Sequence, residues 1–281
     1  MRALILLLAA LPLLAQPQRI VSTAPSITEM LFALGLGNRV VGVTFFCHYP
    51  AEARQIPKIG SYLRPNIEKI ASLRPDLVVL LKSPSRAAEQ LRAMKLNLLE
   101  LEHDTIDGIY SSIAQLGAAT GRKDRAAALT SEIRRELQRI QERTAKFPKR
   151  RMMFIVGRNP GTLAGLVAVG KASYLNEVIA IAGGENVFRD SFAPYPKVSL
   201  EEVLARAPEV IVDMGDMAQT EGVTEEHKKS VIALWNRYSR IPAAEKKNVF
   251  AVASDIFVVP GPRVVEAARA FARMLHPEAG I

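Results

Sequence analysis

Two stretches of the sequence, "NIEKIASLRPDLVVL" at residues 66–80 and "SLEEVLARAPEVIVD" at residues 199–213, follow one pattern. Each begins with a polar residue that can cap a helix, Asn66 or Ser199, and continues with the spacing of a short amphipathic helix. A proline and an acidic residue follow, and then an apolar run with the length of a buried strand. Each stretch therefore predicts a helix that leads into a strand, and the chain contains this unit twice.

Both units carry a glutamate two residues after the cap, Glu68 in the first and Glu201 in the second. A carboxylate in the first turn favours the positive end of a helix dipole by roughly 0.3–1 kcal/mol. Glu202 can in addition close a capping box with Ser199. Helix stabilisation alone is thus a sufficient reason for these acidic residues.

A second pair of stretches is also related: "SITEMLFALGLGNRV" at residues 26–40 and "YLNEVIAIAGGENVF" at residues 174–188 align without a gap. The alignment brings identical residues together: Glu29 with Glu177, Gly35 with Gly183, and Asn38 with Asn186. In the first copy we predict that Ser26 caps the helix and that Glu29 is its capping-box partner. Two related pairs in the same order predict two halves of similar design.

Predicted strands and helices alternate in both halves, and the strands are apolar throughout, which favours parallel sheets covered on both faces. Residues 105–147 contain no predicted strand. Residues 122–147 predict one long helix with a single apolar stripe. The stripe consists of Ala126, Leu129, Ile133, Leu137 and Ile140. The predicted fold class is therefore α/β, with two Rossmann-like lobes that contain parallel sheets and are joined by one long α-helix.

The start of the chain has the features of an export signal, because Arg2 precedes an apolar run from Ala3 to Ala15. We predict four parts: a signal peptide at 1–15, an N-terminal α/β lobe at 16–104, a helical linker with the long interlobe helix at 105–147, and a C-terminal α/β lobe at 148–281. No cysteine follows the apolar run, so lipid attachment is not predicted. The mature protein is expected to be exported to the periplasm, soluble and monomeric.

Composition disfavours several classes of function. The net charge is +9, but aromatic residues make up 6% of the chain and the basic residues are scattered, apart from "KFPKRR" at residues 146–151. This pattern favours a solvated basic surface over a nucleic-acid interface. Cys47 is the single cysteine, which excludes an intrachain disulfide. The four histidines lack metal-ligand spacing, and no P-loop or nucleophile-elbow motif is present, so we predict no metal site and no enzyme.

The whole mature chain resembles a known family, the periplasmic substrate-binding proteins of ABC importers for cobalamin, haem and iron-siderophores, which have a helical connection between their lobes. The likeness is strongest to the cobalamin-binding members. It rests on the order and spacing of several motifs: "STAPSITEMLFALG", "VVGVT", "YP" at 49–50, "NIEKIASLRPDLVV", "GGENVF", "YPKVSLEEVLARAPEVIV" and "SDIFVVPGPRVVEAA".

This resemblance implies an exported binding protein without enzymatic activity or cofactor. It would capture a cobalamin-like corrinoid in the interlobe cleft and deliver it to an ABC importer permease dimer with its ATPase. Two alternatives remain at this point. One is a haem- or ferric-siderophore-binding protein of the same class, with His48, Tyr49 or Tyr62 as a ligand of haem iron. The other is a two-lobed Rossmann-like enzyme, which the sequence disfavours because it lacks a catalytic or phosphate-binding motif.

The ligand is expected over the strand ends between the lobes, and loops there supply the candidate contacts. The predicted ligand-binding residues are Pro25, Ser26, Tyr49, Tyr62, Asn159, Phe192, Tyr195, Phe257 and Arg263. Cobalamin-binding relatives tend to carry tryptophan where Tyr62 and Tyr195 stand, but an aromatic wall for a large flat ligand is retained. Arg263 has three possible roles: to pair with a ligand carboxylate, to hydrogen-bond corrin amides, or to cap the final helix.

The resemblance also assigns a second role to the repeated glutamates. In the family, one exposed glutamate per lobe at this helix position docks onto arginines of the dimeric permease. Glu68 and Glu201 match those positions, with Glu202 as the alternative in the second lobe. Two carboxylates on pseudo-symmetric lobes suit a two-fold partner.

Overall fold

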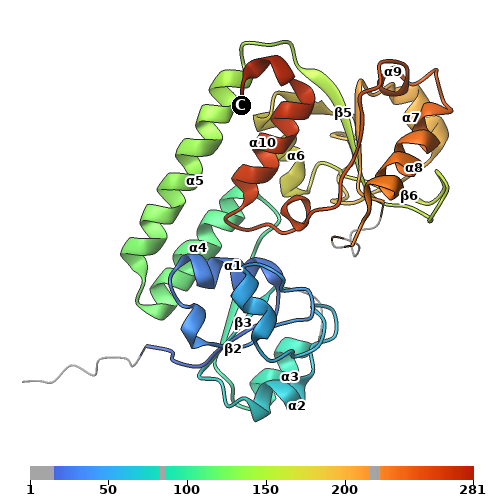
Figure 1. Cartoon of the computed structure of the whole chain (residues 1–281). Helices are drawn as coiled ribbons and strands as arrows, with labels where there is room; N and C mark the ends of the chain where they lie inside the picture. Colours follow the sequence, from blue (N-terminus) through green and yellow to red (C-terminus); the bar gives the residue numbers. More distant parts are fainter. Residues whose placement is uncertain (1–15, 83–85, 216–219, 221) are drawn as a thin grey trace, which may run out of the picture.

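The computed structural model describes residues 16–82, 86–215, 220 and 222–281. The predicted signal peptide at 1–15 lies outside the described residues. Two β-sheets lie at opposite ends of a pair of packed helices, and the final helix of the chain returns to pack beside that pair (Figure 1).

The first sheet has four parallel strands in the order β2-β1-β3-β4. Their bounds are β1 (Ile20–Ser22), β2 (Val40–Gly42), β3 (Leu77–Leu81) and β4 (Leu98–Leu101). All five residues of the central strand β3 are buried, because helices or their connections cover both faces of the sheet. This arrangement agrees with the parallel sheet expected from the apolar strands.

Three helices cover this sheet: α1 (Pro25–Ala33), α2 (Ile67–Ser72) and α3 (Ala87–Ala93). The Asn66 side chain caps α2 as predicted, since its Oδ1 accepts from the Lys69 backbone N–H at 2.8 Å. The predicted cap of α1 is wrong. Ala24 occupies the N-cap and Pro25 begins the helix, which places Ser26 inside the first turn and leaves Glu29 free to reach another part of the molecule.

Two helices connect the sheets, α4 (Ile106–Thr120) and α5 (Lys123–Thr144), and they pack against each other along their length. Gly121 separates them in a left-handed conformation, with a φ of 71° that favours glycine. The 22 residues of α5 extend about 33 Å, so this helix passes from one sheet to the other (Figure 1). The five residues of its predicted apolar stripe are all buried, which confirms the helical period.

The second sheet has six strands in the order β10-β9-β5-β6-β8, with β7 also paired to β5. Their bounds are β5 (Arg150–Gly157), β6 (Leu166–Ala168), β7 (Gly184–Asn186), β8 (Lys197–Val198), β9 (Val210–Asp213) and β10 (Val249–Ala251). The expectation of a parallel sheet is wrong here in part, because β6 runs antiparallel to both β5 and β8. A three-residue strand is too short to show a period in the sequence.

Five helices belong to this half: α6 (Tyr174–Ile181), α7 (Leu200–Arg206), α8 (Glu225–Asn236), α9 (Pro242–Glu245) and α10 (Val264–Leu275). The predicted capping box of α7 is confirmed. The Glu202 N–H donates to Ser199 Oγ at 3.2 Å, and the Ser199 N–H donates to Glu202 Oε2 at 2.8 Å. Short 3₁₀ turns lie at Gly37–Arg39, Ala51–Gln55, Asp255–Phe257 and Pro277–Ala279.

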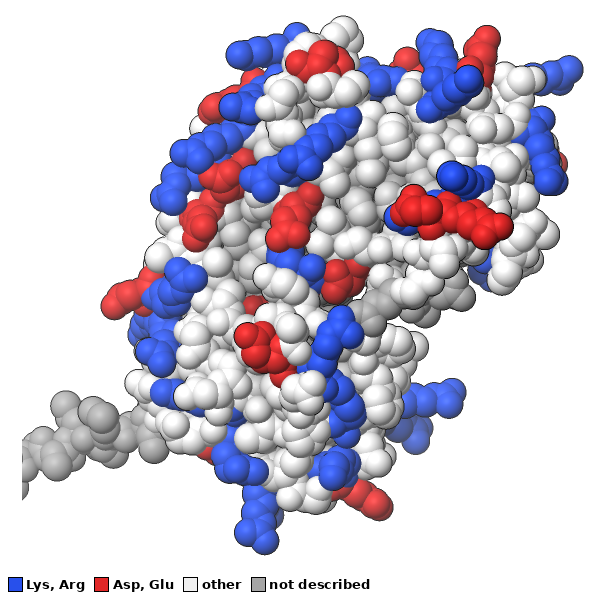
Figure 2. Space-filling view, viewed as in Figure 1, with Lys and Arg blue, Asp and Glu red and all other residues white. Residues whose placement is uncertain are grey.

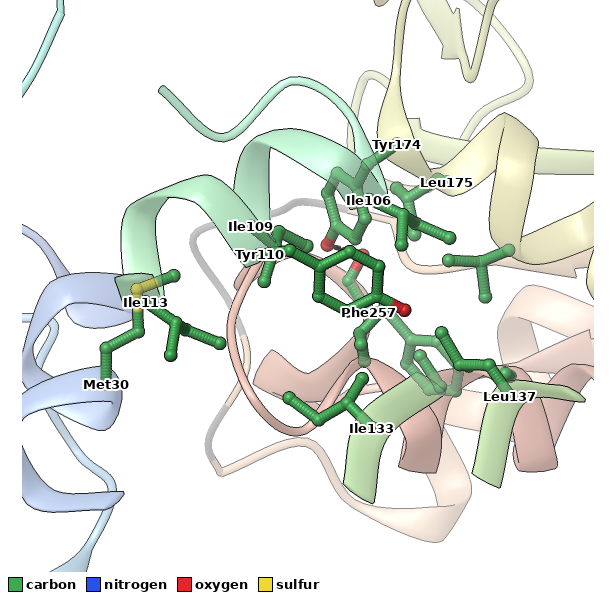
Figure 3. Close-up of a cluster of buried hydrophobic side chains, with 14 of the residues drawn as sticks. Met30, Ile106, Ile109, Tyr110, Ile113, Ile133, Leu137, Tyr174, Leu175 and Phe257 are labelled. Atoms are coloured by element: carbon green, nitrogen blue, oxygen red, sulfur yellow. Dashed lines mark hydrogen bonds between the residues drawn. The ribbon is translucent and has the colours of Figure 1, made fainter. Parts of the chain in front are cut away.

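One continuous apolar core joins the two halves (Figure 3). It runs from Met30 of α1 through Ile113 of α4 to Leu137 of α5, and on to Tyr174 and Phe257 in the second half. Rotation of one lobe against the other would expose part of this core to water. Exposure costs a free energy of about 25 cal/mol per Å² of apolar surface. The shared core therefore resists large lobe movements.

The surface in view carries interspersed basic and acidic side chains rather than one basic face (Figure 2). This distribution agrees with the scattered basic residues of the sequence. Across the part of the chain that the structure describes, no helix combines the length and the apolar character that crossing a bilayer requires.

Candidate functional site

Large apolar side chains are exposed mainly in two loop regions of the described chain. The exposed side chains are Phe45, Phe46, Tyr49, Tyr62 and Leu63 in the first half and Phe192 and Tyr195 in the second, with Met94 elsewhere. Phe192 is 81% exposed and Leu63 is 74% exposed, although phenylalanine and leucine are residue types that usually lie in the core. Exposed apolar side chains that gather in loops mark a binding surface more often than a structural feature.

The two halves approach each other at Tyr49, whose ring centroid lies 4.0 Å from the guanidinium carbon of Arg263. Burial raises the pKa of Tyr195, and the charges of Asp104 and Tyr62 raise it further while a hydrogen bond from Ser173 opposes the change. Asp104 and Tyr62 belong to the first half of the chain, and Tyr195 belongs to the second. The Ser173 hydroxyl, at the N-cap of α6, donates to the Tyr195 oxygen at 3.4 Å.

Arg263 makes the closest polar contact between the lobes that involves a predicted site residue. It lies directly before α10, and both its Nε and Nη2 donate to the Glu29 carboxylate of α1, with 3.0 Å from Nε to Oε2. Nη2 also lies 2.9 Å from Asp255 Oδ2. The guanidinium carbon is 4.0 Å from the ring centroid of Tyr49, in the geometry of a cation–π contact.

This cluster shifts the titration of its members. Burial raises the pKa of Glu29 to about 7, while the hydrogen bond and charge of Arg263 act against that rise. Burial acts to lower the pKa of Arg263, but its hydrogen bonds to Glu29 and Asp255 outweigh burial and raise it. Arg263 therefore stays a cation at every physiological pH, and its Nε and Nη2 contact carboxylates of the protein itself.

Arg263 is not a helix cap through its side chain. It occupies the N-cap position of α10, but no hydrogen bond from its side chain to the helix is formed. Of the roles considered from the sequence, capping is confirmed for the position of Arg263 at the start of α10, without a hydrogen bond from its side chain to the helix. The guanidinium instead links α1 of the first half to the turn before α10 of the second.

Phe257 requires a correction, because its side chain is 3% exposed and lies in the core between Phe154 and Phe271. It is too deeply buried to line a ligand surface, since the short turn Asp255–Phe257 directs its ring inward. Pro25 and Ser26 form the first turn of α1, and the Ser26 side chain is buried.

Asn159 lies in the loop after β5, and Tyr49, Tyr62, Phe192 and Tyr195 are exposed in their loops. The structure therefore leaves these side chains accessible. The sequence prediction missed Phe45, Phe46 and Leu63. The stretch "TFFCHYP" already carried a signal for the first two, because it places large apolar residues after a predicted strand and outside any helix.

The repeated glutamates Glu68 and Glu201 are exposed in the first turns of α2 and α7. The backbone N–H of Glu201 and the Ser199 hydroxyl lower the pKa of the Glu201 carboxyl, so it is ionised at neutral pH. Glu202 is engaged in the capping box. The two helices lie on different lobes, and both lie away from α5 (Figure 1).

The described residues offer little for metal or thiol chemistry. No group of three His, Cys, Asp or Glu side chains is placed to hold a metal ion within the described ranges. Cys47 is buried, and its sulfur lies 3.2 Å from Thr28 Oγ1 and 3.1 Å from Thr44 Oγ1. The surface between the lobes instead combines aromatic rings with a few charged groups, which suits the binding of a flat organic molecule.

Known proteins have the same organisation. The family described as periplasmic binding protein matches residues 20–256. A vitamin B12-binding protein of Yersinia pseudotuberculosis serotype O:1b (strain IP 31758) is 30% identical over 270 residues, which cover 95% of this chain and 90% of that protein.

Solved structures agree with this match. The periplasmic vitamin B12 binding protein of Vibrio cholerae is 26% identical with a TM-score of 0.78, and the match covers 94% of this chain and 98% of that one. The periplasmic heme-binding protein of Roseiflexus sp. RS-1 is 25% identical with a TM-score of 0.79, covering 93% and 99%. These relatives are binding proteins, and so is this chain, rather than an enzyme. The chain belongs to the periplasmic binding protein family.

Proposed function

We propose that this protein captures a cobalamin-like corrinoid between its two lobes and delivers it to the permease dimer of an ABC importer. The observation that carries the proposal is the set of exposed aromatic side chains in loops of both lobes, Tyr49 and Tyr62 in the first and Phe192 and Tyr195 in the second. Rings from two lobes can contact opposite sides of a broad flat molecule. A vitamin B12-binding relative at 30% identity supports a corrinoid as that molecule.

The proposed mechanism is capture with little lobe movement. The apolar core shared by α1, α4, α5 and α10 opposes a large hinge motion. The energy for transport would come from the ATPase of the importer. Residues 1–15 would direct export to the periplasm, and Glu68 and Glu201 would contact the permease.

Haem is the second candidate ligand. A heme-binding relative is 25% identical over nearly the whole chain, and Tyr49 and Tyr62 expose phenol groups that can ligate iron. A ferric siderophore belongs to the same class of bulky chelates.

Calorimetric titration of the purified mature protein separates these ligands. The titrants are cyanocobalamin, cobinamide, haemin and a ferric siderophore. We expect saturable binding of one corrinoid per protein, and weaker or no binding of haemin and the siderophore. Saturation by haemin alone would transfer the proposal to haem, and saturation by none of the four would overturn it. The absorption spectrum of protein purified from its native host provides an independent check, because corrinoid and haem bands differ.

A further inference from the structure

Arg263 is a cation whose charge is already compensated within the protein. Two of its nitrogens donate to Glu29, and one of these nitrogens also contacts Asp255. The Glu29 side chain is 2% exposed, whereas Arg263 is 12% and Asp255 is 22% exposed. With both carboxylates ionised, the three groups together carry a charge of −1.

The cluster borders the aromatic surface between the lobes. The guanidinium lies over the ring of Tyr49, which is 46% exposed. A ligand that packs on this ring would therefore come close to Arg263 and to the partly exposed carboxylate of Asp255.

A ligand carboxylate and a ligand amide would meet this cluster very differently. The carboxylate would approach a cluster whose net charge is −1 when both protein carboxylates are ionised, and it would be repelled by Asp255. An amide carries no net charge and can donate its N–H to a carboxylate, which is a charge-assisted hydrogen bond. The second half retains one cation near an exposed ring, since Lys171 Nζ lies 4.9 Å from the ring centroid of Phe192.

We infer that Glu29 and Asp255 are specificity-determining residues, which compensate Arg263 so that this part of the site accepts uncharged amide groups of a ligand and rejects carboxylates. The inference rests on the proposed function, because it selects among ligands of the same interlobe site. It assigns the preferred ligand class as an amidated corrinoid rather than an acidic tetrapyrrole or chelate.

The test compares ligands that differ in charge but hardly in shape. Cyanocobalamin is titrated against its monocarboxylates, in which one peripheral amide has been hydrolysed, each isomer in turn, at pH 8 and fixed ionic strength. We expect the wild-type protein to bind the amide form at least about tenfold more tightly than one or more isomers, in line with the cost of a like-charge contact. In Asp255→Asn this ratio should fall at least threefold.

Glu29→Gln provides a second variant, which keeps the shape and the acceptor oxygen of the side chain. It too should lower the ratio, by leaving more of the Arg263 charge uncompensated. The matched control is Glu225→Gln on α8, which removes one exposed carboxylate that pairs with Lys228. The control should leave the ratio unchanged, which separates a local effect from a change in net charge.

The outcomes distinguish this inference from the proposed function. If the wild-type protein binds cyanocobalamin and all monocarboxylates equally, or if Asp255→Asn preserves the ratio, the inference is overturned while corrinoid binding stands. If no corrinoid binds at all, both are overturned. If the Glu29→Gln protein does not fold, the affinity ratio of the Asp255→Asn protein still tests the inference, because Asp255 is partly exposed.

Discussion

The α1 and α6 units align in sequence without a gap, yet their matching glutamates perform different tasks. Glu29 of α1 forms a bidentate pair with Arg263, which lies 234 residues away. Glu177 of α6 accepts a backbone N–H from Ile106, at the start of α4, at 3.3 Å. Both glutamates connect their lobe to another part of the molecule. Duplication thus preserved the position of the carboxylate on its helix, but the surroundings of each copy determined its partner.

Glu29→Ala should produce the largest effect, because it breaks the buried ion pair with Arg263. We expect the free energy of unfolding to fall by about 3 kcal/mol, since a buried charge loses its partner and Asp255 compensates only part of that loss. Urea denaturation followed by circular dichroism measures the change. A loss no greater than that of the Glu177→Ala protein would show that the two copies are energetically equivalent.

The pH dependence of the unfolding free energy tests the α1 unit again, through the titration of Glu29. Glu29 has a pKa of about 7 when folded, above its ordinary value of 4.5, so the folded state binds the proton more tightly. Its proton-linked stabilisation is complete below pH 4.5 and is lost as the pH rises through 7. Roughly 2–3 kcal/mol should be lost over this window. The carboxylates of Asp255 and Glu266 favour the proton and Arg263 opposes it, while the phenol of Tyr174 is also close enough to interact with Glu29.

The Glu29→Gln protein is the control for this pH effect, because its side chain does not titrate. The difference in unfolding free energy between wild type and Glu29→Gln should change between pH 5 and pH 8, in the direction of a less stable wild type at high pH. A difference that is independent of pH would contradict the assigned pKa.

In the α2 and α7 units, by contrast, both copies of the glutamate should perform the same task, which is contact with the permease. Reversing both charges, in Glu68→Arg with Glu201→Arg, should lower ligand uptake through the permease about tenfold or more, because like charges would face the proposed arginines. Ligand affinity in solution should stay the same, since both side chains are exposed in the first turns of their helices and neither is among the predicted ligand contacts. Transport into cells or vesicles with the cognate permease measures the effect. Unchanged uptake would remove the docking proposal.

Glu177→Ala should have the smallest effect of the series. The carboxylate is half-buried and accepts a single hydrogen bond, so we expect a loss of about 1 kcal/mol in unfolding free energy. Burial raises the pKa of Glu177, and the Ile106 N–H opposes this rise. Urea denaturation beside the Glu29→Ala protein gives the comparison. A loss as large as that of Glu29→Ala would indicate that the α6–α4 contact is equally important for joining the lobes.

The elements that the sequence predicted well are those specified by local patterns. The apolar stripe of α5, the Asn66 cap and the Ser199–Glu202 capping box all depend on residues within a few positions of one another. Gly35 and Gly183, aligned in the repeat, both adopt positive φ angles, of 75° and 83°. The two errors had different causes. The strand β6 has too few residues to show a period, and Ser26 is not the N-cap because Pro25 begins the helix one residue earlier.

The residues of the candidate site could be proposed from the sequence only as a set of loop residues. Tyr62 and Tyr195 were expected in loops of opposite lobes, and both side chains are exposed in such loops. Phe257 was expected beside them but is part of the core, because the orientation of one side chain in a short turn depends on what packs against it.

The amino-acid sequence by itself determined the alternation of helices and strands, the long connecting helix and the duplicated units, because periods and caps act over a few residues. Only the tertiary structure decided the direction of β6, the burial of Phe257 and the pairing of Arg263 with Glu29. Those features depend on residues far apart in the chain, whose distance is set by how the two lobes pack around their shared core.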